Sequence, residues 1–206
     1  MQQKMLKISN PALESQTTFM NTEKEINPIN TAMVLRAAAE PEAFAMIYDY
    51  FFSAIHKYIF LRIRDEQTTD DLTAQVFERL IKALINYQST KGTFSAWLFG
   101  IARNVVNDHF RAQQRFPWLP IQFLNQMASP HPSPEKMLAY KEADQQLLSA
   151  LNQLTDRERE LIALKYATEL NNRQIAKITG LSENNIGIIL FRALRKLRDR
   201  IGKENE

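Results

Sequence analysis

Three polar residues, Glu183, Asn184 and Asn185, stand in succession near the end of this 206-residue chain, at the start of its last amphipathic segment. Asparagine pairs well with the edge of adenine, and glutamate accepts a hydrogen bond from cytosine. Arg192 and Arg195 follow on the same segment, where their charges suit the phosphates of a nucleic acid. The chemistry that these residues offer together is recognition of DNA.

The segment around them has the spacing of a helix-turn-helix. Ile175 is an inward position on a first short helix, and Gly180 follows that helix where the tight turn needs a positive φ. Ile186 and Ile189 point back from a second helix, which Ser182 caps. The pattern predicts a helix-turn-helix whose second helix enters the major groove. An ordinary helical hairpin is the alternative.

The chain lacks the residue patterns of a catalytic or metal centre. His56, His109 and His131 are far apart and lack the spacing of metal ligands, and there is no cysteine. Neither a glycine-rich phosphate loop nor a nucleophile elbow occurs. We therefore expect no cofactor, no metal and no enzymatic activity. The missing cysteines and the lack of a long apolar run favour a cytoplasmic protein without membrane insertion.

Helices must position these residues, because apolar side chains recur every three or four positions and no strand pattern occurs. The expected fold class is all-α, with two small domains. Residues 1–30 show no periodicity and are predicted to be a flexible tail. The N-terminal domain is expected over 31–115, with helices at about 31–39, 41–64, 68–85 and 93–114.

The composition changes after this domain. Five prolines fall between residues 116 and 134, which excludes a regular helix. The sequence predicts a Pro-rich linker over 116–133 and a C-terminal domain over 134–206, with Pro134 in the first turn of a helix. Further helices are expected to start at Thr155, which has Glu158 three residues later as in a capping box, and near Asn171.

With both halves in view, the chain resembles the extracytoplasmic-function (ECF, group IV) sigma factors, the promoter-specificity subunits of bacterial RNA polymerase. The resemblance covers residues 31–201. It rests on DDLTAQVFERL (70–80), on FSAWLFGIARNVVNDHFR (94–111) and on the segment 154–198, which contains the helix-turn-helix. It implies a sigma region 2-like domain followed by a region 4-like domain. The implied partners are core RNA polymerase, promoter DNA and, as is common in the family, an anti-sigma factor.

The resemblance assigns docking on core polymerase to the third helix. The residues implied are Asp70, Asp71, Leu72, Gln75 and Glu78. The polar members of this set suit a basic partner surface, although a solvated helix face would have the same composition. Phe77 is either part of this surface or part of the core. Relatives often have Gln-Glu where this chain has Ala74 and Gln75, so one expected carboxylate is missing.

The loop NYQSTKGT and the fourth helix resemble the family's reader of the minus-ten promoter element, which holds one unstacked base. The implied DNA-binding residues are Tyr87, Gln88, Lys91, Arg103, Asn104, Asn107 and Arg111. Stacking and hydrogen bonds must offset the cost of extruding the base. We expect Trp97 to be a core residue. A pair of Asn104 with Asp108 that holds Arg111 or Arg115 is the structural alternative for this helix.

The helix-turn-helix resembles the reader of the minus-thirty-five element. The implied residues are Arg173, Gln174, Glu183, Asn184, Asn185, Arg192 and Arg195. Many relatives carry Lys, Ser and Arg where this chain has Gly187, Ile188 and Ile189, so those phosphate contacts are absent here. Arg198 and Arg200 either meet phosphates or form a solvated helix end that the helix dipole favours.

Two other functions compete with a sigma factor. One is a stand-alone helix-turn-helix regulator with a helical sensing or dimerisation domain, and the other is a helical interaction protein that binds no DNA. The net charge of +3 is small for a protein that binds DNA tightly by itself, which favours the sigma factor. The apolar linker residues Trp118, Leu119 and Phe123 serve either a closed state of the protein or a path toward the polymerase active site.

Overall fold

The computed structural model describes residue 29 and the ranges 31–115, 150–168 and 170–203, and every regular element within them is a helix. The prediction of an all-α fold is confirmed for this part of the chain. The predicted linker, most of the predicted tail and the predicted helix start at Pro134 lie outside the described residues.

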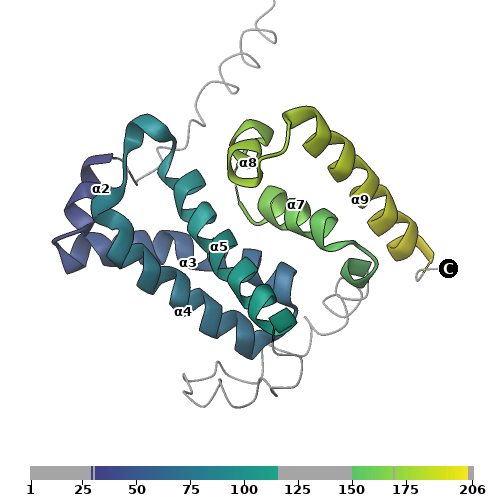
Figure 1. Ribbon diagram of the computed structural model, residues 1–206, viewed down its shortest axis with the longest axis horizontal. Coiled ribbons are helices and arrows are strands. Elements are labelled where there is room, and N and C mark those ends of the chain that lie inside the picture. Colours follow the sequence, from purple (N-terminus) through teal and green to yellow (C-terminus); the bar gives the residue numbers. More distant parts are fainter. Residues whose placement is uncertain (1–28, 30, 116–149, 169, 204–206) are drawn as a thin grey trace, which may run out of the picture. The chain divides into compact units, whose positions relative to one another are not determined.

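The helices follow one another along the chain as shown in Figure 1. They are α2 (Thr31–Ala37), α3 (Pro41–Ile63), α4 (Glu66–Ala83), η1 (Leu84–Asn86), η2 (Ser89–Lys91), α5 (Phe94–Arg115), α7 (Asp156–Tyr166), α8 (Asn172–Thr179) and α9 (Glu183–Lys203). None of the described helices is long and apolar enough to cross a bilayer.

Local signals in the sequence set the ends of the helices in the first group, α2 to α5. Pro41 occupies the first turn of α3, and Arg64 ends this helix in the left-handed conformation, with φ at 63°. Asp65 caps α4 by accepting a hydrogen bond of 2.8 Å from the backbone N–H of Thr68. This cap explains why α4 begins at Glu66, earlier than the sequence pattern predicted.

The core of this group lies between α3, α4 and α5. Ile47, Phe51 and Ile55 of α3 are buried, in agreement with their spacing of four residues. Tyr48 lies three residues before Phe51, on the same side of the helix, but is 38% exposed, because its ring lies at the edge of the core against Phe77 of α4. The apolar face of α3 is therefore narrower at this point than the periodicity predicts.

The second group, α7 to α9, contains the predicted helix-turn-helix. Thr155 and Glu158 form the predicted capping box at the start of α7, and Asn171 forms another with Gln174 at the start of α8. Gly180 ends α8 with φ at 75°, the left-handed conformation that was predicted for the turn. Ser182 then caps α9, which begins at Glu183.

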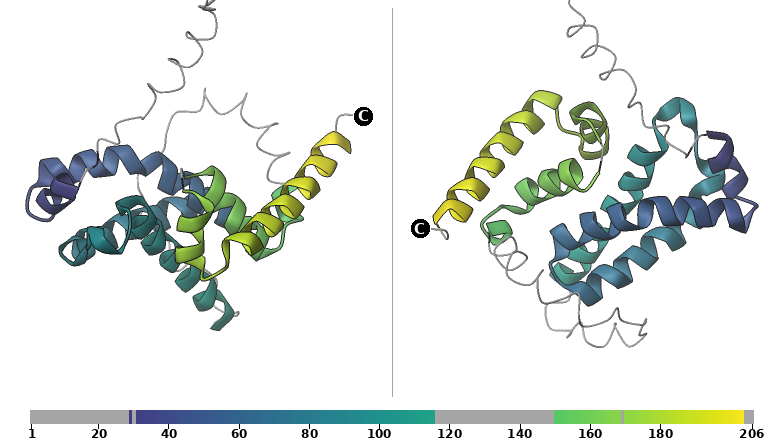
Figure 2. Two further views of the ribbon diagram at one scale, coloured as in Figure 1. Left: turned by 90° about the horizontal axis from the view of Figure 1, so that it is seen from above. Right: turned by 180° about the vertical axis from the view of Figure 1, so that it is seen from behind.

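Helix α7 is buried on more than one side. Its residues Leu161, Ile162, Ala163 and Leu164 are all buried, although an amphipathic surface helix would bury only one stripe. Helix α7 packs against α9 and α8 in its own group and also against α3, while α8 contacts α5. Figure 2 shows α7, α8 and α9 from two further directions. The two groups of helices therefore share contacts along α7 and α8.

Candidate nucleic-acid interface

Helix α9 presents the predicted polar residues on its outer surface. Its inner stripe consists of Ile186, Leu190 and Ala193, which are all buried. The residues predicted to meet the minus-thirty-five element, Glu183, Asn184, Asn185, Arg192 and Arg195, are all exposed. A helix that buries one stripe against its domain and exposes polar and cationic residues on the other suits insertion into the major groove of DNA.

One polar contact orders the start of α9 and another ties the helix to α7. The side chain of Ser182 accepts a hydrogen bond of 3.3 Å from the backbone N–H of Asn185, which orders the first turn. Farther along, Nζ of Lys196 lies 2.7 Å from a carboxylate oxygen of Glu158 in α7. Burial by itself would raise the pKa of Glu158, but hydrogen bonds from Lys196 and Thr155 together with the charge of Lys196 hold this pKa below its ordinary value. The carboxylate thus caps α7 and anchors α9 at once.

Helix α8 carries the other predicted residues of this half. Arg173 is exposed. Gln174 has both ends of its amide engaged: Oε1 accepts a hydrogen bond of 2.9 Å from the backbone N–H of Asn171, and Nε2 donates one of 3.0 Å to the hydroxyl of Thr93. Thr93 directly precedes α5, so Gln174 joins the two groups of helices. Gln174 is therefore less available to a ligand than the sequence indicated.

A cavity of about 430 Å³ lies beside the loop before α5. Its lining includes Tyr87, Gln88 and Lys91 of the loop together with Asn104 of α5, all predicted to bind minus-ten DNA. The lining also includes Trp97 and Gly100 of α5, and Lys177 and Ile178 of α8. The structure thus gathers the loop and one side of α5 around a single space.

Aromatic side chains form one wall of this cavity. Tyr87 is only 9% exposed, and its ring centroid lies 5.3 Å from that of Phe94 and 5.2 Å from that of Trp97. Its hydroxyl donates a hydrogen bond of 3.3 Å to the carbonyl of Gly92, and burial raises its pKa. Trp97 is half-buried and lines the cavity, so the prediction of a pure core residue is only partly right.

On the polar face of α5 some residues are exposed to solvent, while others form ion pairs within the protein. Lys91, Asn104 and Arg111 are exposed, and Asn107 is half-buried. The predicted structural role of Asp108 is present in a different form. Its carboxylate pairs with Arg79 of α4 at 2.8 Å and with Arg111 at 3.3 Å. Asp108 therefore ties the end of α5 to α4 as well as restraining Arg111.

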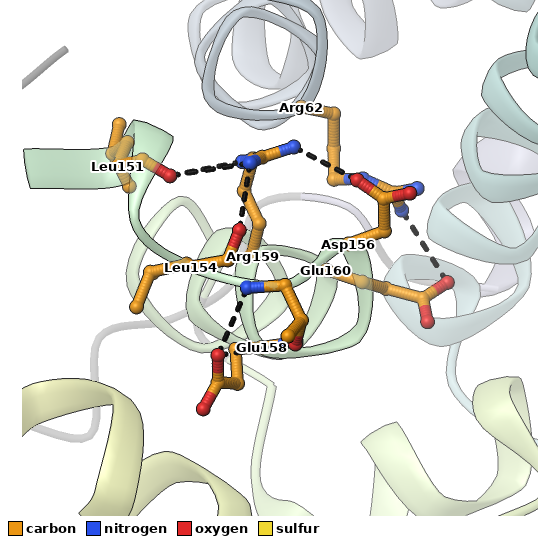
Figure 3. Close-up of polar contacts among 8 residues, drawn as sticks. Arg62, Leu151, Leu154, Asp156, Glu158, Arg159 and Glu160 are labelled. Carbon is orange, nitrogen blue, oxygen red and sulfur yellow. Dashed lines mark hydrogen bonds and ion pairs between the residues drawn. The ribbon is translucent and has the colours of Figure 1, made fainter. Parts of the chain in front are cut away.

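Arg103 points toward the second group of helices. Its Nε donates a hydrogen bond of 2.7 Å to Oε1 of Glu160 in α7. Arg157 approaches the other carboxylate oxygen at 2.6 Å. Nη1 of Arg62 lies 3.4 Å from Oε1 (Figure 3). The side chains of Arg62 and Glu160 are each only 5% exposed. Burial alone would raise the pKa of Glu160, but the three arginines hold it below its ordinary value.

The neighbouring Arg159 forms hydrogen bonds with the backbone. Its guanidinium donates hydrogen bonds to the carbonyls of Leu151 and Leu154, the latter at 2.8 Å, and pairs with Asp156 (Figure 3). These contacts hold the turn that precedes α7. Sequence reasoning missed both Glu160 and Arg159, because charged residues on a helix are usually solvated. The available signal was a run of charges, 156–160, leading directly into a short apolar helix.

The predicted polymerase-docking helix, α4, has a polar outer face. Asp70 lies 2.9 Å from Nε2 of His56, and Glu78 pairs with Lys82 at 2.6 Å. Gln75 is exposed. Asp71 is half-buried, and burial followed by the nearby Asp70 and Asp65 raises its pKa. Asp70, Asp71, Gln75 and Glu78 are thus all at least partly accessible to a partner.

Two apolar residues of this helix belong to the core. Leu72, predicted to contact polymerase directly, is only 4% exposed, so that prediction is corrected: Leu72 holds α4 on its domain. Phe77 is also buried, with its ring centroid 4.5 Å from that of Tyr48. This resolves the two interpretations of Phe77 in favour of the core.

Two family models match the chain in order. Sigma-70 region 2 matches residues 47–116, and Sigma-70 region 4 matches residues 144–197. The ECF RNA polymerase sigma factor BldN of Streptomyces coelicolor is 28% identical over 160 residues, which are 78% of this chain and 61% of BldN. The ECF sigma factor SigX of Bacillus subtilis is 28% identical over 167 residues, covering 76% of this chain and 82% of SigX.

Solved structures show the same fold. CnrH, in complex with the cytosolic domain of CnrY, has a TM-score of 0.62 at 21% identity, covering 84% of this chain and 96% of CnrH. The sigma factor RpoE of Bartonella quintana, in complex with the anti-sigma factor NepR, has a TM-score of 0.61 at 21% identity, covering 78% of this chain and 98% of that one.

Proposed function

Because this chain belongs to the ECF RNA polymerase sigma factors of the sigma-70 family, we propose that it directs bacterial RNA polymerase to specific promoters and initiates transcription there. Within that family we place it in group IV. We place it in the cytoplasm. It is proposed to hydrolyse no nucleotide, because the energy for strand opening would come from contacts with polymerase and from capture of a base. We assign region 2-like functions to residues 31–115 and region 4-like functions to 134–206.

The observation that carries the proposal is the cavity beside the loop before α5. Tyr87, Gln88, Lys91 and Asn104 line it, and its volume of about 430 Å³ is within the range of small-ligand sites. An unstacked base needs a concave site with aromatic walls and a few polar groups at the rim. Trp97 and Tyr87 supply the aromatic wall, and the amide groups of Gln88 and Asn104 can pair with base edges.

The second promoter contact is assigned to α9. Its exposed first turn carries Glu183, Asn184 and Asn185, which suit base edges, while Arg192 and Arg195 suit phosphates. Arg173 at the start of α8 adds a further cation. Two separate reading surfaces, each of modest charge, fit a protein that binds promoters as part of a larger enzyme.

Core polymerase is proposed to dock on the outer face of α4. Asp70, Asp71, Gln75 and Glu78 form a mostly acidic surface there, which suits a basic partner. An anti-sigma factor is proposed as a further partner, since CnrH and RpoE, which share the fold, were each solved in complex with another protein, in the case of RpoE an anti-sigma factor.

Run-off transcription with purified core polymerase tests the proposal. We expect the full chain to produce promoter-dependent transcripts from fragments of its own genome, and we expect promoter binding to be strong with core enzyme and weak without it. Tight, specific duplex binding by the chain alone would favour a stand-alone regulator. Absence of any promoter-dependent product would contradict the sigma-factor assignment.

A further inference from the structure

The outer surface of α9 carries two large apolar side chains among its polar ones. Ile188 is 43% exposed and Phe191 is 69% exposed, although each lies within the helix that presents Asn184 and Arg195. Single exposed apolar residues are common on proteins and need no explanation. Ile188 and Phe191 lie three residues apart and therefore on one side of the helix. Because this helix is the one assigned to DNA, the exposure of both side chains calls for an explanation.

Ile188 lies at the centre of the outward face. Two residues along an α-helix turn through about 200°. The buried residues Ile186 and Leu190 each lie two positions from Ile188, so Ile188 points almost directly away from the core. By the same geometry, Asn184, Phe191, Arg192 and Arg195 all lie within about 60° of it around the helix axis.

Charge around the patch points to the occupant. Arg192 and Arg195 flank Ile188 on the side of the C-terminal end of the helix, and both are exposed. Arginines also occur at protein interfaces, but DNA presents phosphates on both sides of a groove, within reach of cations that flank a residue facing the bases. Among the groups on the floor of the major groove, the thymine methyl is the apolar one, and it distinguishes thymine from every other unmodified base.

We propose that Ile188 is a specificity-determining residue of this chain, which contacts the C5-methyl group of a thymine in the minus-thirty-five element. The inference rests on the proposed function, because it needs α9 in the major groove. Ile188 cannot donate or accept a hydrogen bond, so it selects by burying a methyl group. Phe191, one turn farther along, extends the same apolar strip toward the next base step.

Replacing thymine by deoxyuridine tests the proposal, because this change removes only the methyl group. The full chain with core polymerase first selects promoters from a library with a randomised minus-thirty-five element. Each thymine of the selected element is then replaced singly by deoxyuridine, and the affinity of the holoenzyme for the duplex is measured. We expect one replacement to weaken binding roughly threefold to tenfold, as expected for loss of one buried methyl contact.

The variant Ile188→Ala, which removes the γ and δ carbon atoms, should lose most of the difference between the thymine and the deoxyuridine duplexes, while Ile188→Thr, which keeps a γ-methyl group, should retain a larger part of it. Leu35→Ala, which truncates an exposed aliphatic side chain of α2, is the matched control and should keep the full difference. Circular dichroism confirms that each variant is folded.

Three results would overturn the inference while leaving the sigma-factor assignment intact. The first is that the selected elements contain no thymine. The second is that no deoxyuridine replacement weakens binding. The third is that Ile188→Ala weakens binding to core polymerase in the absence of DNA. The last result would show that the patch docks on the polymerase. A holoenzyme that selects no promoter at all would overturn the proposed function, and this inference with it.

Discussion

Nε of Arg103 lies 2.7 Å from Oε1 of Glu160, although 57 positions of sequence separate the two residues. The contact joins α5, which carries proposed minus-ten contacts, to α7 in the group of the helix-turn-helix. Arg103 itself is one of the proposed minus-ten residues. The contact with promoter DNA that the family resemblance implies for Arg103 would therefore require this ion pair to open.

The first prediction concerns the stability that Glu160 confers. The variant Glu160→Gln keeps the size of the side chain but removes the charge that faces Arg62, whose side chain is only 5% exposed. Leaving a buried charge without its partner typically costs about 3–5 kcal/mol, so we expect a loss of this order in the free energy of unfolding. Urea denaturation followed by circular dichroism measures it.

The control for this variant is Glu78→Gln, which removes one partner of an ion pair on the surface of α4. The side chains of Glu78 and Lys82 are 62% and 72% exposed, and such exposed pairs contribute little to stability because water screens their charges. Equal effects of the two variants would contradict the view that the Glu160 cluster is a buried, structural contact.

The second prediction concerns pH. The arginines lower the pKa of Glu160 in the folded chain, whereas an unfolded glutamate titrates at about 4.3. The stabilisation by Glu160 is therefore fully present above the unfolded pKa and is lost as the pH falls through the lower, folded value. The difference in unfolding free energy between the natural chain and Glu160→Gln should be constant near neutral pH and shrink below about pH 4. A difference that grows on acidification would contradict this sign.

The local structure of the chain could be predicted largely from its sequence. The signals that succeeded depend on neighbours in sequence: the capping box of Thr155 and Glu158, the second box at Asn171, and the positive φ of Gly180. Each involves atoms within one helical turn, so the residue types alone are sufficient to specify it.

The parts that sequence failed to predict depend on distant contacts. Arg103 and Gln174 were both assigned to DNA, but each has a partner in the other group of helices, Glu160 and Thr93 respectively. The periodicity of a sequence shows on which face of a helix a residue lies. It does not show which other part of the protein packs against that face. The docking role of Leu72 had a different origin: the resemblance implied it, whereas the side chain is only 4% exposed and packs in the core.

The third prediction contrasts two glycines of the helix-turn-helix. At Gly187, inside α9, a Cβ atom would meet nothing within 4 Å, so Gly187→Ala should raise the free energy of unfolding by about 1 kcal/mol through helix propensity. At Gly180, φ is +75°, so Gly180→Ala should lower it by roughly 1–2 kcal/mol, the cost of the left-handed conformation. Thermal unfolding of both variants checks the opposite signs, and a stabilised Gly180→Ala would disprove the assigned turn.

The fourth prediction concerns the cavity beside α5. Gly100 lines it, and a Cβ atom at this position would meet nothing within 4 Å. The variant Gly100→Leu should therefore fold but fill part of the space proposed for the unstacked base. We expect strand opening at the promoter to decrease while duplex binding through α9 persists. The permanganate reactivity of unpaired thymines measures the strand opening. Gly100→Ala is the control, because one methyl group leaves most of the cavity open. Normal strand opening by a folded Gly100→Leu would contradict a base-binding role for this cavity.

The fifth prediction separates affinity from specificity on α9. Arg192 is exposed and proposed to meet a phosphate, so Arg192→Ala should weaken holoenzyme binding to all promoters alike. The slope of the logarithm of the binding constant against the logarithm of the salt concentration should become shallower by about one. Asn185 is exposed in the first turn and is proposed to meet a base edge. Asn185→Ala should therefore change base preference at one position, by roughly 1–3 kcal/mol, with the salt dependence unchanged. Binding measured over a salt series, on the selected promoter and on single-base variants of it, separates the two effects. Unchanged affinity and unchanged base preference in both variants would show that this face of α9 does not lie on the promoter.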